Sequence, residues 1–595
     1  MKLIATILAA AAICAALTAY GCGGGMNAGS GAGGNPPPAP FNTPFWAQWG
    51  SNPQHTGMVS VAGQGATRQL ANIVYDPFVS QEQAASGGEL LVHYQATLTD
   101  GNDVYMMNKT GTYAGPDSWS SEVWWEARFT WENGGLVQIW NFASDWKPEP
   151  NSVNLEGWEP VFHPVDANGF IYVPGAGGTI WKVNKTTGMS ASHINPFSGM
   201  NIAAANTYVT GPLTADSQGN IYYNVIELAD PSVGDWAEHD VQGAWLVKVA
   251  SSDSASTVSY ATLVPNAPAA TAQTCPGTFN NLNDGGVSLP WPPANVVGTI
   301  QAAPTQACGS QRPGINLAPA VGSDGTIYTA SLSHFDGMSA YLVAVNSNLT
   351  PKWAASLQNR LSDGCGVLVA IAPASNPNLP NSCRNGATLG IDPTTNAPGS
   401  GSIIDEASSS PTVLPDGTVL FGAITNYNAE RGHLFHFDAS GNYLGAYDFG
   451  WDTTPAVYAH NGTFSILLKD NHYDAPTYCF YSNSICQTLP PGPYYITQLD
   501  ANLNVEWQFQ NATQDAAHPN GYEWCINMPA VDMNGNVYVN SEDGNIYELT
   551  QSNPGTPAGK LFLNLAIGAA YTPLSIGADG KLYTQNDGHL FVVGN

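Results

Sequence analysis

Charged residues are scarce in this 595-residue sequence, and basic residues are scarcest. Only 10% of the residues are charged, with Lys+Arg 16 against Asp+Glu 45 and a formal net charge of −29. No run of basic residues is longer than two. Nucleic-acid binding needs a basic surface, so this composition excludes that class of function. We interpret the acidity as favouring solubility, with binding of Ca²⁺ or of cationic partners as the alternative.

Several other patterns are missing. The sequence has no CxxC or CxxCH motif, no P-loop and no nucleophile elbow, and its histidines do not cluster with cysteines at zinc-ligand spacing. Past the N-terminus it has no apolar run of about 18 residues and no sustained helical period. What is abundant is Gly (63), Pro (43), Tyr (26) and Trp (17). Turn formers and aromatics in a weakly charged chain predict many short strands.

The N-terminus has the pattern of an export signal. Met1–Lys2 is a short positive region, and an apolar stretch follows from Leu3 to Ala19. Ala19-Tyr20-Gly21-Cys22 resembles a bacterial lipobox, although Ala19 replaces the usual Leu and Tyr20 the usual small residue. The resemblance implies a signal peptide over 1–21 and lipidation of Cys22. The alternative is ordinary cleavage nearby, which would release a secreted protein.

The segment 22–40 is predicted to be a tether. It is rich in Gly, Asn, Ser and Pro and ends near Pro36–Pro38, a composition that cannot form a packed core. The folded part would then span 41–595, held at the cell envelope, and we expect an outer-membrane anchor, on the periplasmic or the surface side. The tether would keep this folded part away from the lipid.

One phrase recurs through the chain: a Pro or polar residue, a short apolar run, an Asp/Asn-Gly type of turn, and an apolar–aromatic run. Such turns between apolar runs are a strong hairpin signal, because they need positive φ. We read each copy as two antiparallel strands, A and B. The copies are Gln95–Tyr105 (the weakest), Pro160–Val173, Pro212–Tyr222, Pro319–Tyr328, Pro411–Leu420, Pro455–Ile466, Pro529–Tyr538 and Pro573–Tyr583.

A second phrase usually follows and supplies strands C and D, as in Gly178–Asn184, Tyr341–Asn346, His433–Asp438 and Tyr495–Asp500. Four strands repeated eight times predict an all-β fold, a single eight-bladed β-propeller. Seven blades would be the count if the weak first copy lay outside the ring. The last copy ends at strand C, so its fourth strand must come from elsewhere in the chain. Trp46–Trp49 and the residues that follow to Gly57 resemble the N-terminal entry of propellers with such repeats, and we predict that this segment completes the last blade and closes the ring, which leaves no long free edge.

The repeats resemble those of pyrroloquinoline-quinone (PQQ)-type propellers, and the resemblance covers about residues 41–595. Similar repeats occur in quinoprotein dehydrogenases and in lipoprotein propellers that assist outer-membrane protein assembly. The first group implies PQQ with calcium as a cofactor, and the second implies a protein partner. The sequence departs from the dehydrogenases because it has no adjacent Cys-Cys pair and no motif matching their calcium-binding Glu/Asn/Asp set.

The long connections are predicted to share one face. In a four-stranded blade the A–B and C–D turns lie on one face and the B–C and D–A connections on the other, which we call the long-loop face. All the long insertions fall on that face, where a rigid scaffold presents its binding sites. They are 228–242 and 470–492 (B–C), and 266–314, 360–407 and 511–527 (D–A).

The cysteines fall on the same face. In an oxidising compartment the simplest pairing is within each insertion: Cys275–Cys308, Cys365–Cys383 and Cys479–Cys486. Spacing alone does not fix this connectivity. Cys525 is left over, free or paired in place of one of these.

Acidic, imidazole and aromatic groups cluster in three of the insertions. Such groups suit a partner or glycan, or acid–base or metal chemistry; the alternative is that they are solvated loop residues. The Asp/Asn-rich turns at Asp166, Asp216 and Asp532 are interpreted as turns rather than calcium loops, because they lack a distal Glu ligand. The candidate binding residues are Trp236, Glu238, His239 and Asp240, then Asp470, His472, Tyr473 and Asp474, then Tyr522 and Trp524.

The leading hypothesis is therefore a binding or scaffold module, with no catalytic residue, no metal site and no cofactor assigned. A protein or a glycan at the envelope would bind its long-loop face. The alternatives are a quinone-dependent dehydrogenase or a carbohydrate-active enzyme using the same face, and an assembly lipoprotein for outer-membrane proteins. Fold alone does not choose among them.

Overall fold

The computed structural model divides the chain into Met1–Pro38 and Ala39–Asn595, and only the second unit contains described residues. The description covers residues 44–115, 119–150, 158–229, 238–276, 305–362, 390, 397–425, 431–472, 492–564 and 572–595. The predicted signal peptide, tether and Cys22 therefore lie outside it. Among the described residues, no helix is long and apolar enough to cross a membrane.

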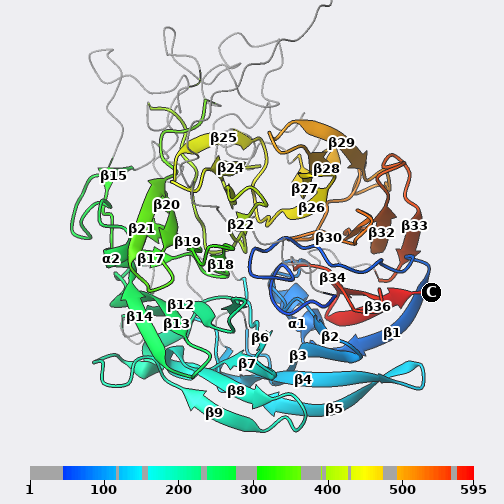
Figure 1. Ribbon diagram of the computed structural model, residues 1–595, viewed down its shortest axis with the longest axis horizontal. Coiled ribbons are helices and arrows are strands. Elements are labelled where there is room, and N and C mark those ends of the chain that lie inside the picture. The colour runs from blue at the N-terminus through cyan, green and yellow to red at the C-terminus, as the bar shows by residue number, and fades with distance from the viewer. Residues whose placement is uncertain are drawn as a thin grey trace, which may run out of the picture. The chain divides into compact units, whose positions relative to one another are not determined.

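Eight antiparallel sheets follow one another in chain order around a ring (Figure 1). This confirms the all-β propeller and its eight blades, with the copy at Gln95–Tyr105 as the first. Blade by blade, the strands are β2 Leu98–Asp100, β3 Asp103–Gly111, β4 Glu122–Glu132 and β5 Gly135–Ala143; β6 Val165–Ala167, β7 Phe170–Pro174, β8 Ile180–Asn184 and β9 Ser190–Ile194; β11 Thr214–Ala215, β12 Ile221–Glu227, β13 Gly243–Val249 and β14 Ala255–Ser259; β18 Ala320–Val321, β19 Ile327–Ser333, β20 Asp336–Val345 and β21 Pro351–Ser356; β22 Thr412–Val413, β23 Val419–Ala423, β24 His433–Phe437 and β25 Tyr443–Tyr447; β26 Ala456–His460, β27 Thr463–Asn471, β28 Tyr494–Leu499 and β29 Val505–Gln510; β30 Ala530–Val531, β31 Val537–Asn540, β32 Asn545–Leu549 and β33 Gly559–Phe562; β34 Ser575–Ile576, β35 Leu582–Asn586, β36 His589–Gly594 and β1 Arg68–Val74.

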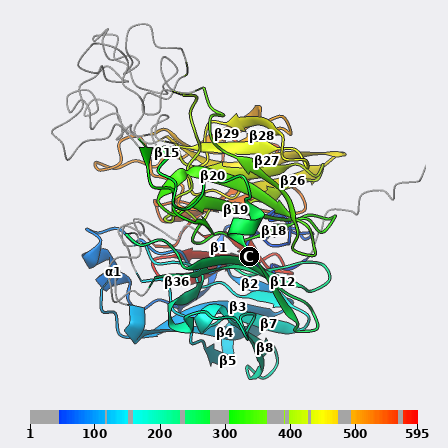
Figure 2. The ribbon, with the colours of Figure 1, turned by 90° about the vertical axis from the view of Figure 1, so that its left-hand side faces the viewer.

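The structure has further, smaller elements besides the four strands of each blade. Two further strands, β10 Thr207–Val209 and β17 Gln311–Pro313, pair with β12 and β19. The helices α1 Val79–Ala85 and α2 Tyr260–Leu263 lie in D–A connections, and Figure 2 shows the ring edge-on with α1 at one side. A separate pair, β15 Cys275–Pro276 and β16 Thr305–Gln306, belongs to the insertion 266–314.

The Asp/Asn-Gly turns have the positive φ that hairpins require. In the turns before β7 and β27 both central residues are left-handed, with φ 55° at Asn168 and 48° at Asn461, each followed by a Gly. Elsewhere an Asp carboxylate accepts backbone amides of its own turn, as Asp216 and Asp532 do. These carboxylates are therefore engaged by the turn.

The ring is closed by an N-terminal strand, but the predicted segment was wrong. The strand that completes the last blade is β1, Arg68–Val74, which pairs antiparallel with β36. A fourth strand is the outermost of its blade, and β1 is accordingly half exposed. Trp46 and Trp49 are 0% exposed, so they could not lie in such a strand without losing their burial.

The segment 46–64 instead runs past the innermost strands of all eight blades, and we call it the N-terminal lace. It meets each blade near the end of its strand A, where an unpaired strand edge would otherwise leave buried amides without partners. The backbone amides of blades 1 to 7 donate to the lace at Trp46 (from Thr99), Ala47 (Asp166), the Gln48 side chain (Ala215), Pro53 (Val321), Gln54 (Val413), Thr56 (Val457) and Gly57 (Val531), and the lace amide of Gln64 donates to Gly580 of blade 8.

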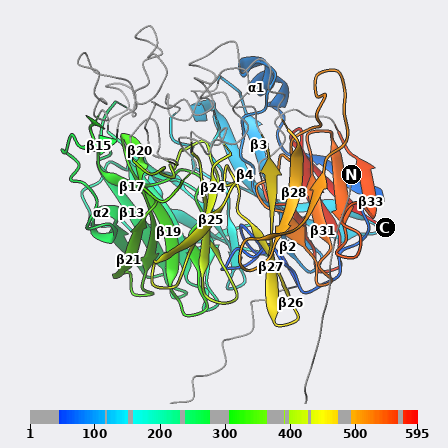
Figure 3. The same ribbon diagram turned by 90° about the horizontal axis from the view of Figure 1, so that it is seen from above.

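The described ends of the long connections lie at one end of the strands, as the strand bounds require. The insertions 228–242 and 470–492 join strands B and C, and 266–314, 360–407 and 511–527 join blades. In Figure 3, α1 and β15 lie at the same end of the strands, at the top of the view. This is the long-loop face. The connection 75–97, which carries α1, also belongs to it and was not predicted.

Candidate functional site

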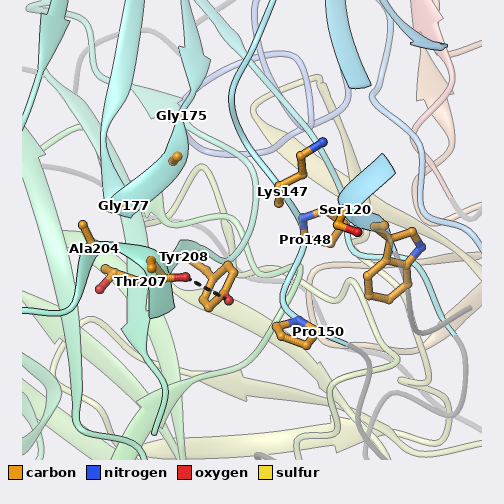
Figure 4. Close-up of a pocket in the computed structure, with 12 residues that line it drawn as sticks. Ser120, Lys147, Pro148, Pro150, Gly175, Gly177, Ala204, Thr207 and Tyr208 are labelled. Atoms are coloured by element: carbon orange, nitrogen blue, oxygen red, sulfur yellow. Dashed lines mark hydrogen bonds between the residues drawn. The ribbon is translucent and has the colours of Figure 1, made fainter. Parts of the chain in front are cut away.

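A cavity of about 300 Å³ lies among connections of the first three blades on the long-loop face. Its walls come from four separate connections, three of which form single turns of 3-10 helix: η1 Trp119–Ser121, η2 Ala176–Gly178 and η3 Ala204–Asn206. Figure 4 shows Ser120, Lys147 and Pro148 on one side, facing Ala204, Thr207 and Tyr208 on the other. The remaining lining residues are Trp119, Pro150, Gly175, Ala176, Gly177 and Ala205.

The glycine-rich wall is held by Asp145. Its carboxylate accepts the Ala176 amide at 3.2 Å and the indole N–H of Trp181 at 2.7 Å. Gly177 and Gly178 both have positive φ, and a Cβ at Gly178 would lie 2.7 Å from Phe197 and 2.9 Å from Val225. Only glycine fits this backbone path, so the loop is placed by its sequence.

The polar groups of the cavity are few. Burial lowers the pKa of Lys147, against the opposing effect of Glu122. Its ammonium donates to the Glu122 backbone carbonyl and lies 5.3 Å from the Trp124 ring centroid. Burial, aided by Glu149, raises the pKa of Tyr208 to about 12, so its hydroxyl keeps its proton at neutral pH. With the Ser120 and Thr207 hydroxyls, these groups offer hydrogen bonds within an otherwise apolar wall.

Sequence reasoning missed this cavity because its walls come from four connections that carry none of the candidate groups singled out in the sequence. The signals were present in the Lys147-Pro-Glu-Pro150 run, in Trp119, and in the glycine-rich Gly175–Gly178 loop. None of them stands out until the blades bring the connections together.

The first predicted group engages the neighbouring insertion. Glu238 is exposed and His239 partly exposed. The Asp240 carboxylate accepts the amide and the hydroxyl of Ser310, both at 2.8 Å. Asp240 thus fixes the end of the insertion 266–314. Trp236 lies outside the described residues.

In the second predicted group, Asp470 is buried and already surrounded by donors. It accepts Tyr447 at 2.7 Å and Arg431 at 3.3 Å, and the His472 ring lies 3.2 Å away. Burial alone would raise the pKa of Asp470, but His472, Arg431 and Tyr447 together lower it below its usual value. Its carboxylate is committed to this network. Tyr473 and Asp474 lie outside the described residues.

The third predicted group is also engaged. Tyr522 donates to Asp515 at 2.5 Å and stacks on His518 with ring centroids 4.0 Å apart. Trp524 is 0% exposed and packs against Phe509 and Tyr547. None of the predicted binding residues that the structure describes lines the cavity. Their role in binding remains a prediction.

The insertion 266–314 contains the predicted disulfide, which joins Cys275 of β15 to Cys308, two residues past the end of β16. The other two predicted pairs lie outside the described residues. Cys525 is free and buried, with its sulfur 2.9 Å from a Glu542 oxygen. Burial, followed by Glu542 and Glu523, raises the pKa of this thiol well above its usual value, so it is a poor nucleophile.

Three buried cations that could bind the carboxylates of PQQ, a tricarboxylate quinone, are already paired within the protein. The Arg312 guanidinium is taken by Asp405 through bonds of 2.8 and 2.6 Å. Lys109 is surrounded by carboxylates, and Lys469 lies 3.8 Å from Asp452. Deeper in the ring, Trp49 packs among Ala96, Val161 and Ala318 of blades 1, 2 and 4. We therefore assign no quinone mechanism to this chain.

Neither a family model nor a curated protein matches the chain. Among solved structures, it is similar to a europium-containing methanol dehydrogenase (TM-score 0.49, 11% identity, 91% of this chain and 89% of that one). It is also similar to a quinohemoprotein alcohol dehydrogenase from Comamonas testosteroni (0.47, 10%, 93% and 81%) and to BamB from Moraxella catarrhalis (0.37, 12%, 89% and 99%). At these values the likeness extends to the propeller fold alone.

Proposed function

We propose that this chain is a non-enzymatic binding module, lipid-anchored to the bacterial outer membrane, and that the cavity on its long-loop face is the binding site. The observation that carries this proposal is the cavity itself. Its walls combine Trp119, two prolines and Tyr208 with a single ammonium and three hydroxyls. A concave, mostly apolar surface with a few convergent polar groups is the usual form of a ligand site.

The lining favours recognition over chemistry. No carboxylate or imidazole is among the described lining residues. Acid–base chemistry needs such groups within hydrogen-bond reach of the substrate, and glycoside hydrolysis needs two carboxylates across the scissile bond. The cavity can bind part of a glycan or a side chain of a protein partner. Assembly of outer-membrane proteins would be one use of a protein-binding site.

The anchor is supported by the sequence. The apolar segment Leu3–Ala19, the lipobox-like Ala19–Cys22 and the Gly/Pro-rich segment 22–40 follow one another in the order of a lipoprotein. Metabolic labelling with a palmitate analogue tests it: label should be found on the wild-type chain and be lost in Cys22→Ser. A wild-type chain without label would overturn the anchor.

Filling the cavity should abolish binding. Ala205 is exposed and lines the cavity, so Ala205→Arg places a long charged side chain in it. We expect retention of the partner from envelope extract to fall at least about tenfold, or about 1.4 kcal/mol. The matched control is Met189→Arg, at a position that is 70% exposed in the C–D turn of blade 2, on the opposite face.

The same capture distinguishes the two kinds of partner. Protease treatment of the extract should remove a protein partner, whereas periodate oxidation should remove a glycan. Equal retention by Ala205→Arg and the wild type would show that the cavity is not the site.

A further inference from the structure

A cluster of buried charges lies next to the cavity, around Lys109 near the end of β3. The ammonium of Lys109 is 2.7 Å from Glu82, 2.8 Å from Glu159 and 3.0 Å from Asp76. The side chains of Lys109 and Asp76 are 0% exposed, and those of Glu82 and Glu159 are 7% and 4% exposed. One buried ammonium therefore pairs with three buried carboxylates.

A fourth carboxylate, Glu122 at the start of β4, points into the same cluster. Its side chain is 0% exposed, and its nearest oxygen is 3.6 Å from the Lys109 ammonium, which is too far for a hydrogen bond. Neither oxygen of Glu122 has a hydrogen-bond partner among the described residues. Oε2 of Glu82 has no such partner there either. A buried carboxylate without a partner costs several kcal/mol, so its persistence calls for a compensating group.

Charge and geometry both identify that group. When all four carboxylates are ionised, one ammonium leaves three negative charges in excess, and Lys109 cannot donate to all of them. One oxygen from each of Glu82, Glu122 and Glu159 lies within 4.8 Å of the others. Oxygens that bind Ca²⁺ at about 2.3–2.6 Å have separations of this size. Carboxylate oxygens are the ligands that this ion prefers.

We infer that Glu82, Glu122 and Glu159 form a Ca²⁺ site beside Lys109 and Asp76, where the ion reduces the excess negative charge from three to one. The ligands come from α1, from the start of β4 and from the connection that follows blade 1. The site is separate from the cavity, although Glu122 follows η1 of the cavity wall directly and its carbonyl accepts Lys147. It requires no quinone and does not depend on the proposed binding partner.

The test is calcium binding by the full chain after removal of metal with a chelator. Equilibrium dialysis should show Ca²⁺ retained in a 1:1 ratio, and calcium should raise the thermal midpoint by several degrees. Glu122→Gln should retain no ion and show no calcium shift. It should also melt above the metal-free wild type, because it removes an uncompensated buried charge. Glu542→Gln, which alters the acidic pair beside Cys525, should behave as the wild type.

A second readout needs no variant. Trp124 lies close to the cluster, with its ring centroid 6.0 Å from the Lys109 ammonium. Terbium bound at the site should therefore luminesce on tryptophan excitation, and calcium should quench the signal by displacement. A wild type that retains no calcium and gives no sensitised emission would overturn the inference, and so would undiminished calcium binding by a folded Glu122→Gln.

Discussion

Lys109→Met should lower the free energy of unfolding by at least about 3–5 kcal/mol, the largest effect we expect from a single substitution. Burial opposes the charge on Lys109, but Asp76, Glu159, Glu82 and Glu122 together raise its pKa well above the usual value. Removing the ammonium leaves four buried carboxylates without a protein cation. Chemical denaturation of the metal-free chain measures the loss.

The loss should depend on pH in a definite direction. Burial, against the opposing effect of Lys109, raises the pKa of Glu82 and Glu159 to about 8 and that of Glu122 to about 7, from an ordinary value of 4.5. The folded chain thus holds protons that the unfolded chain releases, so stability falls as the pH rises from about 4.5 through 8. Lys109→Met should therefore lower the free energy of unfolding more at pH 8 than at pH 5.

Lys182→Met is the matched control. Lys182 pairs with Asp253 at 2.7 Å, but the two side chains are 13% and 33% exposed, and water screens the pair. Its loss should cost about 1 kcal/mol. Equal losses in the two variants, or a Lys109→Met loss that is the same at pH 5 and pH 8, would contradict the account of the buried cluster.

Trp49→Ala should cost about 3–5 kcal/mol, because it removes a large side chain from the middle of the ring. Trp49 is 0% exposed, packs with Ala96, Val161 and Ala318, and meets His163 edge-on with ring centroids 5.4 Å apart. The N-terminal lace that carries it is bonded to all eight blades. The thermal transition should therefore move as a whole, without a separate early phase.

Trp125→Ala is the comparison for this prediction. Trp125 is only partly buried on β4, and its indole N–H donates to Thr110. Its removal should cost less than half as much as that of Trp49. A Trp49→Ala variant within about 1 kcal/mol of the wild type would show that the lace does not stabilise the ring.

The fold could be predicted because its signal is local and repeated. Asn168-Gly169 and Asn461-Gly462 mark hairpins by the positive φ they adopt, and the same phrase recurs at each blade. The closing strand was placed wrongly because Trp46–Trp49 was chosen for its resemblance to the N-terminal entry of other propellers, and Arg68–Val74 was not singled out. Burial distinguishes the two segments. Trp46 and Trp49 are fully buried, whereas the half-polar Arg68–Val74 is partly exposed and forms the outer edge of the last blade.

The candidate site could not be predicted in the same way. Trp119, Lys147, Ala176 and Tyr208 come from four connections that meet only in the folded ring. We predicted that the acidic groups of the insertions would be free to bind a partner. The Asp470 and Asp240 carboxylates instead accept hydrogen bonds inside the protein. One local signal was overlooked: Lys109 follows the apolar run Val104–Met107 within a strand, where a buried cation needs partners.

The central claim is that a partner binds at the cavity of blades 1–3. Its most direct test is photo-crosslinking in cell envelopes, with benzoylphenylalanine at position 205 in one chain and at position 189 in another. The account predicts a discrete adduct from position 205 and none from position 189. Adducts from position 189 alone, or from neither position while the partner is still captured, would place binding elsewhere on the propeller.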